Sequence, residues 1–242
     1  MFEHILVPLD GSRLAECVLP HSVAIARSFN AQITLLRMLE KNQAGGSAQL
    51  FDLLHWQINK TDATLYLKKT KAWFQESNIH VHTAVHEGLV AEGITEFALH
   101  QEMKLIVLSS HGRSGLTQWG ISSIAHKIIL SAPSSVLIVR AHQQGIHPGE
   151  LSAAPLYQRI LVPLDGSQRA EHVFPIIAQI AHANKSQVHL VQVVQTPEIA
   201  RRMPPAREDI DLSDRVVARN REEAEHYLER VKSRSDLEGI AI

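Results

Sequence analysis

The chain carries one eight-residue segment twice. Residues 5–12 and residues 160–167 both read Ile-Leu-Val-Pro-Leu-Asp-Gly-Ser. The similarity extends further: at a constant offset of 155, 16 of the 31 positions in 5–35 are identical to those in 160–190. A repeat of this length indicates that one structural unit occurs twice. An apolar run ending in Asp-Gly-Ser is typical of a buried strand that turns directly into a helix, and open α/β sheets bind ligands beyond such strand ends.

Segments with strand composition alternate with segments of helical periodicity after the first octapeptide. The expected strands are 2–9, 31–39, 79–85, 104–109 and 135–140, and the expected helices follow Ser12 and cover 50–77, 91–101 and 122–130. Strands alternating with helices predict a doubly wound α/β fold, with an open parallel sheet and right-handed crossovers.

The domain boundaries follow from composition and from the repeat. Residues 1–141 are predicted to form one domain, 142–157 a linker that contains Gly145, Pro148, Gly149 and Pro155, and 158–242 a second copy. This copy contains a strand, a helix, a second strand and a charged helix near 214–233, so it is incomplete. Its first strand, 160–164, would then have an unpaired edge, which is an aggregation hazard. We expect a fragment of a longer tandem protein, rather than a half-domain that packs on the first unit or on another chain.

Composition argues against several classes of protein. The 24 basic and 25 acidic residues are balanced, which argues against a nucleic-acid partner. Cys17 is the single cysteine, which excludes a disulfide framework and fits a reducing compartment. No apolar stretch approaches the length of a membrane span, and no leader precedes the first strand. We therefore expect a cytoplasmic protein with no membrane partner.

The segment after the fourth expected strand, residues 109–123, is rich in glycine and serine. Small residues allow close approach of a ligand, and consecutive amide groups before a helix form an anion cradle. The alternative interpretation is an ordinary strand-to-helix turn that uses glycine and serine for their conformations.

Three segments together resemble the universal stress protein family. They are the octapeptide at 5–12, Ser-His-Gly-Arg-Ser-Gly at 110–115, and Pro-Ser-Ser-Val-Leu-Ile-Val-Arg at 133–140. The resemblance covers 2–140 as a whole domain and 158–242 as an incomplete one. It implies a five-stranded sheet of order 3-2-1-4-5 with helices on both faces, and a role in stress response. Members of this family divide into those that bind ATP and those that do not.

In the ATP-binding members a glycine, two residues, a second glycine and nine residues precede a Gly-Ser or Gly-Thr pair. Ser109, Gly112 and Ser122-Ser123 stand at those positions here, so two motif glycines are serine. Serine lacks the access of glycine to positive φ, so ATP binding weakens if either position requires that conformation. The resemblance implies that ATP, with or without Mg²⁺, contacts the residues Pro8, Leu9, Asp10 and Met38 around the adenosine and Leu108, Ser109, His111, Gly112, Ser122, Ser123 and Ile124 around the phosphates and ribose.

Three functions stay open. The first is a regulator with an ATP-dependent switch in the first domain. The second is an interaction module without nucleotide, in which 135–140 or the second unit makes a dimer-like interface, and a homodimer through 135–140 is the corresponding prediction. The third is a hydrolase or nucleotidyl enzyme. Against it, the sequence lacks a Gly-x-x-x-x-Gly-Lys-Ser/Thr loop and a positioned base, so any ATP hydrolysis should be slow. Asp10 and Asp165 have a further interpretation as turn and capping residues.

Histidines at 80, 82 and 86 alternate along the third expected strand. The strand rise separates His80 from His86 by about 20 Å, so only His80 and His82 could share a metal ion. Exposed polar residues on a sheet edge are the preferred interpretation, and no metal site is predicted.

Overall fold

The computed structural model describes residues 1–242 except 41–48, 113–119, 142–150, 152–155, 197–206 and 235–236. The chain forms two compact units, Met1–Leu156 and Tyr157–Ile242. Most of the predicted linker, together with Arg113 and Trp119 of the glycine- and serine-rich segment, lies outside the described residues. None of the helices in the described part of the chain combines the length and the apolar character that a membrane crossing requires.

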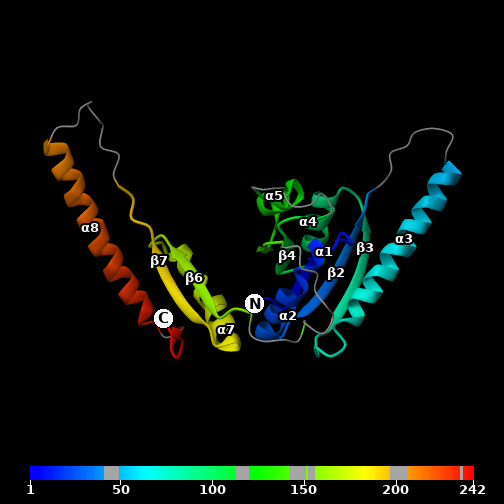
Figure 1. The fold of residues 1–242 in the computed structure, drawn as a ribbon, viewed down its shortest axis with the longest axis horizontal. Coiled ribbons are helices and arrows are strands. Elements are labelled where there is room, and N and C mark those ends of the chain that lie inside the picture. The colour runs from blue at the N-terminus through cyan, green and yellow to red at the C-terminus, as the bar shows by residue number, and fades with distance from the viewer. Residues whose placement is uncertain (41–48, 113–119, 142–150, 152–155, 197–206, 235–236) are drawn as a thin grey trace. The chain divides into compact units, whose positions relative to one another are not determined.

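The first unit is a five-stranded parallel sheet in the order β3-β2-β1-β4-β5, as predicted. Its strands are β1 (His4–Pro8), β2 (Gln32–Leu39), β3 (Val81–Glu87), β4 (Leu105–Ser109) and β5 (Ser135–Val139). Its helices are α1 (Arg13–Glu16), α2 (Leu19–Phe29), α3 (Gln49–Ala72), α4 (Val90–His100) and α5 (Ser123–Ser131). Helix α3 covers one face of the sheet, and α4 and α5 cover the other (Figure 1).

The octapeptide forms the same turn in both units. Ser12 N–H donates to Asp10 Oδ1 at 2.8 Å, and Ser167 N–H donates to Asp165 Oδ1 at 2.9 Å. The serine hydroxyl then caps the next helix, since Ser12 Oγ accepts from Ala15 N at 3.1 Å. The glycine between aspartate and serine has a φ of 80° in unit 1 and 81° in unit 2, a conformation that favours glycine. The turn therefore explains why Asp-Gly-Ser recurs, whatever else Asp10 does.

The element boundaries differ from the predicted ones where local chemistry interrupts the periodicity. The single helix expected after Ser12 is two helices, because Pro20 has no N–H to continue the ladder across Cys17 and Val18. Helix α3 ends at Ala72 rather than at 77. It is followed by turns with hydrogen bonds between residues three apart, such as the one that Trp73 N–H donates to Thr70 O at 3.1 Å. Strand β3 starts and ends two residues later than expected.

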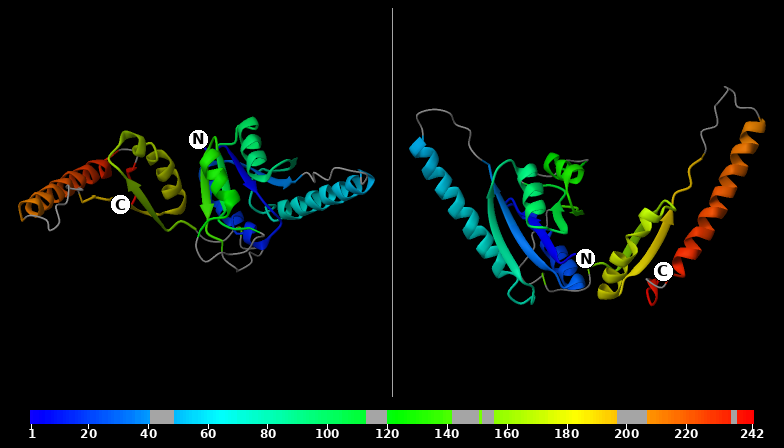
Figure 2. Two further views of the ribbon diagram at one scale, coloured as in Figure 1. Left: turned by 90° about the horizontal axis from the view of Figure 1, so that it is seen from above. Right: turned by 180° about the vertical axis from the view of Figure 1, so that it is seen from behind.

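The second unit contains a two-stranded parallel sheet of β6 (Arg159–Leu164) and β7 (Gln187–Gln192). Its helices are α6 (Gln168–Glu171), α7 (Phe174–Asn184) and α8 (Arg207–Lys232), the last starting earlier than the predicted 214 (Figure 2). Val188 N–H donates to Ala241 O at 2.7 Å, just as Ile33 N–H donates to His80 O at 2.9 Å. The residues near 241 thus occupy the place where the third strand begins in unit 1, as the sequence predicted.

Within the described residues of unit 2, helices cover one face of the sheet and leave the other face uncovered. Helices α7 and α8 pack on the face that contains Val162 and Leu164. On the opposite face Leu161 is 67% exposed, whereas Leu6, its counterpart in unit 1, is 0% exposed. Leu6 packs with residues of α4, β4 and α5, and the described part of unit 2 has no counterpart of these elements.

This difference predicts unequal effects of one substitution made in both repeats. Leu6→Ala should lower the free energy of unfolding of unit 1 by about 2–5 kcal/mol, because it leaves a cavity in a packed core. Leu161→Ala should change that of unit 2 by no more than about 0.5 kcal/mol, because the side chain already contacts solvent. Urea denaturation of the two variants measures both values. A large loss in Leu161→Ala would contradict the uncovered face.

Candidate functional site

A pocket of about 690 Å³ lies beyond the carboxyl ends of β1, β2 and β4. This is the point where the chain leaves β1 for neighbours on either side, the usual ligand position in doubly wound sheets. Ten of the eleven residues proposed from the sequence line it: Pro8, Leu9, Asp10, Met38, Leu108, Ser109, His111, Gly112, Ser122 and Ile124. Ser123 is exposed and is not among the lining residues.

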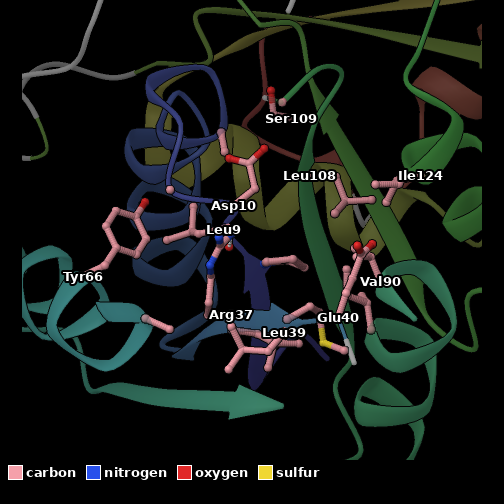
Figure 3. Close-up of a pocket in the computed structure, with 18 of the residues that line it drawn as sticks. Leu9, Asp10, Arg37, Leu39, Glu40, Tyr66, Val90, Leu108, Ser109 and Ile124 are labelled. Atoms are coloured by element: carbon pink, nitrogen blue, oxygen red, sulfur yellow. Dashed lines mark hydrogen bonds between the residues drawn. The ribbon is translucent and has the colours of Figure 1, made fainter. Parts of the chain in front are cut away.

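The turn after β1 and the loop after β4 meet at Asp10 and Gly112. A Cβ atom added to Gly112 would overlap Asp10 Oδ2 and would lie 3.3 Å from Asp10 Cγ. At 112, glycine avoids an overlap with the Asp10 carboxylate, and positive φ is not the reason for glycine there. Because the two loops touch, the carboxylate of Asp10 lies in the middle of the pocket, between its two sides (Figure 3).

Ser109, at the first motif position, keeps an ordinary backbone conformation. The described non-glycine residues with positive φ are Asn30, Asn78, Glu102 and Lys185, so neither Ser109 nor Ser122 has the φ that glycine would be needed for. The Ser109 hydroxyl lies 2.9 Å from Leu14 O and 2.7 Å from His111 O, and its one proton is donated to one of these two carbonyls at a time. Serine at 109 thus ties the loop to α1 instead of straining it.

Ser122, at the last motif position, is the N-cap of α5. Its φ is −58°, its hydroxyl accepts from Ala125 N at 3.2 Å, and its own N–H donates to Ser110 O at 2.9 Å. The first-turn amides of Ser123 and Ile124 have no acceptor within the helix. They provide the partial positive charge that anions seek at a helix N-terminus.

Ser110 and His111, at the start of the loop after β4, form hydrogen bonds that fix the position of this loop. Ser110 N–H donates to Val139 O at 2.8 Å, and Ala141 N–H donates to Ser110 Oγ at 3.0 Å, which joins β4 to the end of β5. The His111 ring is buried, with Nδ1 3.0 Å from Ser110 Oγ. This arrangement makes His111 a structural residue, although it lines the pocket.

The side of the pocket next to α4 and α5 is mostly apolar. Met38 and Leu108 are buried there, and Val90, Ile94 and Ile124 lie beside them. The exposed Glu40 lies at the edge of this side, next to Val90 (Figure 3). In β2, Leu36 and Met38 point to this face and pack in the same core cluster as Ile94 of α4. Such a wall fits the flat apolar surface of an aromatic ring.

The other side of the pocket is lined by α3, which the sequence analysis did not assign to the site. Trp56, Asn59, Ala63 and Tyr66 follow the spacing i, i+3, i+7, i+10 and so lie on one helix face. Arg37 of β2 lies below them, with Nη1 donating to Leu9 O at 3.1 Å. The signal available in the sequence was the repeat, because Asn220, Ala224 and Tyr227 show the same spacing in α8.

Tyr66 connects this wall to α1. Its hydroxyl donates to Glu16 Oε1 at 3.0 Å. Burial raises the pKa of Glu16, an effect that the bond from Tyr66 reduces. Burial, and then the charge of Glu16, raises the pKa of Tyr66, so its hydroxyl keeps its proton and remains a donor.

The three histidines of the third strand do not share one exposed face. His80 precedes β3 and its ring lies 4.6 Å from that of His82, whereas His86 is half-buried with its ring 5.9 Å from that of Phe97. Within the described residues no group of three or more histidine, cysteine, aspartate or glutamate side chains is arranged to hold a metal ion.

Comparison with known proteins identifies the family. The family model described as the universal stress protein family matches residues 1–140 and 156–240. Universal stress protein MJ0531 of Methanocaldococcus jannaschii is 29% identical over 145 residues, which are 58% of this chain and 83% of that protein. Universal stress protein Sll1654 of Synechocystis is 29% identical over 140 residues, 57% of this chain and 86% of that protein.

Among solved structures, a putative universal stress protein from Pseudomonas aeruginosa matches with a TM-score of 0.60 and 16% identity, covering 97% of this chain and 72% of that one. An identity this low supports the fold alone. The family model, by contrast, covers both repeats, and the sheet order agrees with the order expected for the family. This chain belongs to the universal stress protein family.

Proposed function

We propose that unit 1 binds ATP in the pocket beyond β1, β2 and β4, and that the protein acts in stress response through a nucleotide-dependent switch. The observation that carries the proposal is that the residues predicted from three separate segments, after β1, at the end of β2 and around the loop after β4, line one pocket. Its volume of about 690 Å³ lies within the usual range of small-molecule sites.

Each part of ATP has matching chemistry in this pocket. The adenine ring fits the apolar wall that Met38 and Leu108 form. The phosphates fit the backbone at Gly112 and the first-turn amide of Ile124, which attract anions. Asp10 accepts from ribose hydroxyls, and Mg²⁺ on the phosphates offsets its negative charge.

The proposal is for binding rather than for rapid hydrolysis. Among the described residues that line the pocket there is no lysine, and the His111 ring is buried against Ser110. The cytoplasmic location expected from the composition stays a prediction.

The alternative function is an interaction module that uses the outer edge of β5. Among the described residues β5 pairs only with β4, and Val136, Leu137 and Ile138 are half-buried. Apolar side chains along an unpaired edge favour pairing with a second strand. The two functions are compatible, since the pocket and this edge use different residues.

Gly112→Val should abolish ATP binding. A side chain at 112 fills the space where two loops meet and where the phosphates are proposed to lie. Calorimetry with Mg²⁺ and ATP should give micromolar affinity for the wild type and no detectable heat for the variant.

Because a side chain at 112 also displaces Asp10, a matched pair of variants is the control. Asp10→Ala and Asp165→Ala remove the same turn hydrogen bond, one in each unit. Only Asp10→Ala should weaken ATP binding, by about tenfold or more. Equal effects of both variants would contradict a direct role of Asp10.

Restoring the family glycine at 122 should leave the ATP affinity within about threefold. Ser122 has a φ of −58°, so glycine relieves no strain there, and glycine is itself an acceptable N-cap. The same calorimetry measures this. A gain of a hundredfold in affinity would mean that the serine obstructs the ligand.

If the protein forms a homodimer through β5, the wild type should sediment with the mass of two chains at micromolar concentration. Leu137→Lys should give a monomer, because a lysine at the centre of the edge repels its symmetry mate. Circular dichroism of the variant checks that it folds. A wild-type protein that sediments as a monomer would rule out this interface.

A further inference from the structure

The pocket has two chemically different sides, separated by Asp10. The α4–α5 side is mostly apolar and includes Met38, Val90, Ile94, Leu108 and Ile124, with the carboxylate of Glu40 next to Val90. The α3 side is mostly polar and aromatic and includes Arg37, Trp56, Asn59, Asp62 and Tyr66, together with Leu39 and Ala63. Figure 3 shows Tyr66 and Ile124 on opposite sides of Asp10. A single adenosine on the α4–α5 side, with its phosphates along the loop after β4, leaves the α3 side unused.

The helix face that forms the α3 side of the pocket continues along α3 into the buried core, and its residue types change between the two parts. Further along α3 the same helix face carries Leu67, Thr70 and, beyond the helix end, Phe74, all of which are buried. Where this face passes the end of the sheet, it carries Trp56 and Asn59 instead.

The groups on the α3 side match those that bind a nucleoside. The Trp56 ring is half-buried and has Lys60 Nζ 4.5 Å from its centroid on one face. The amide of Asn59 both donates and accepts, as a base edge requires, and the carboxylate of Asp62 accepts from ribose hydroxyls. Arg37, whose Nη1 donates to Leu9 O at 3.1 Å, adds positive charge to this side.

Unit 2 gives an internal comparison. Asn220, Ala224 and Tyr227 repeat Asn59, Ala63 and Tyr66, but Val217 stands in place of Trp56 and Gln192 in place of Arg37. The shared residues belong to the common fold of α3 and α8. The aromatic ring and the guanidinium are specific to the unit that has the pocket.

We propose that the pocket binds a dinucleoside polyphosphate, with one base on the α4–α5 side and the second nucleoside stacked on Trp56. The polyphosphate, as its magnesium complex, then spans Gly112 and the start of α5. This inference rests on the proposed function, because it needs the phosphate contacts near Gly112.

Calorimetry with diadenosine tetraphosphate and with ATP, both with Mg²⁺, tests the inference. The wild type should bind the dinucleotide about tenfold more tightly than ATP, since stacking of one base on an aromatic ring is worth about that factor. Trp56→Leu should remove this advantage and leave the ATP affinity within about twofold. Ile58→Ala, on the outer face of the same helix and 55% exposed, is the matched control and should change neither affinity.

A second variant keeps the test decisive if Trp56→Leu does not fold by circular dichroism. Asn59→Ala changes an exposed side chain and should weaken dinucleotide binding alone. Equal affinities for the two ligands would overturn the inference while ATP binding stands. Equal weakening of both ligands by Trp56→Leu would also overturn it, because a single base would then lie on the α3 side. Absence of binding by either ligand would overturn the proposed function as well.

Discussion

The contact between Asp10 and Gly112 is the constraint on which the site depends. It joins the turn after β1 to the loop after β4, two segments about 100 residues apart in the chain. The Asp10 carboxylate lies against Gly112, and both loops line the same pocket. The hydrogen bonds of Ser109 to Leu14 and of Ser110 to β5 keep the second loop in that position.

Comparison of the two repeats distinguishes the structural role of the Asp-Gly-Ser turn from the role of the pocket. Both octapeptides make the same aspartate–serine hydrogen bond and the same positive φ at glycine. Among the described residues only unit 1 adds the elements from β4 to β5, which bring Gly112 to the turn and cover Leu6. The shape that the turn has in both repeats is therefore explained by folding. The proposed ligand binding depends instead on the loop after β4 and on α5, which lie next to the turn in unit 1.

Much of the fold was predictable from the sequence because strands and helices alternate with clear periodicity and the repeat marks two units. The sheet order was predicted from the family resemblance. Eleven site residues were predicted in the same way, and all of them except Ser123 line the pocket. The α3 side was not predicted, because Trp56 and Asn59 are far in sequence from every motif and their spacing is equally typical of a core stripe. The effect of Ser109 and Ser122 depended on backbone dihedrals, which composition does not reveal. Pro20 was visible in the sequence, but its interruption of the first helix was overlooked.

The number of ATP molecules bound per chain tests the central claim most directly. Two octapeptides are present, but the account assigns the ligand to the pocket that β4 and α5 complete. Equilibrium dialysis at saturating ATP with Mg²⁺ should give one nucleotide per chain. Two per chain would show that the octapeptide turn itself binds ATP, and none would show that the pocket of unit 1 does not serve this ligand.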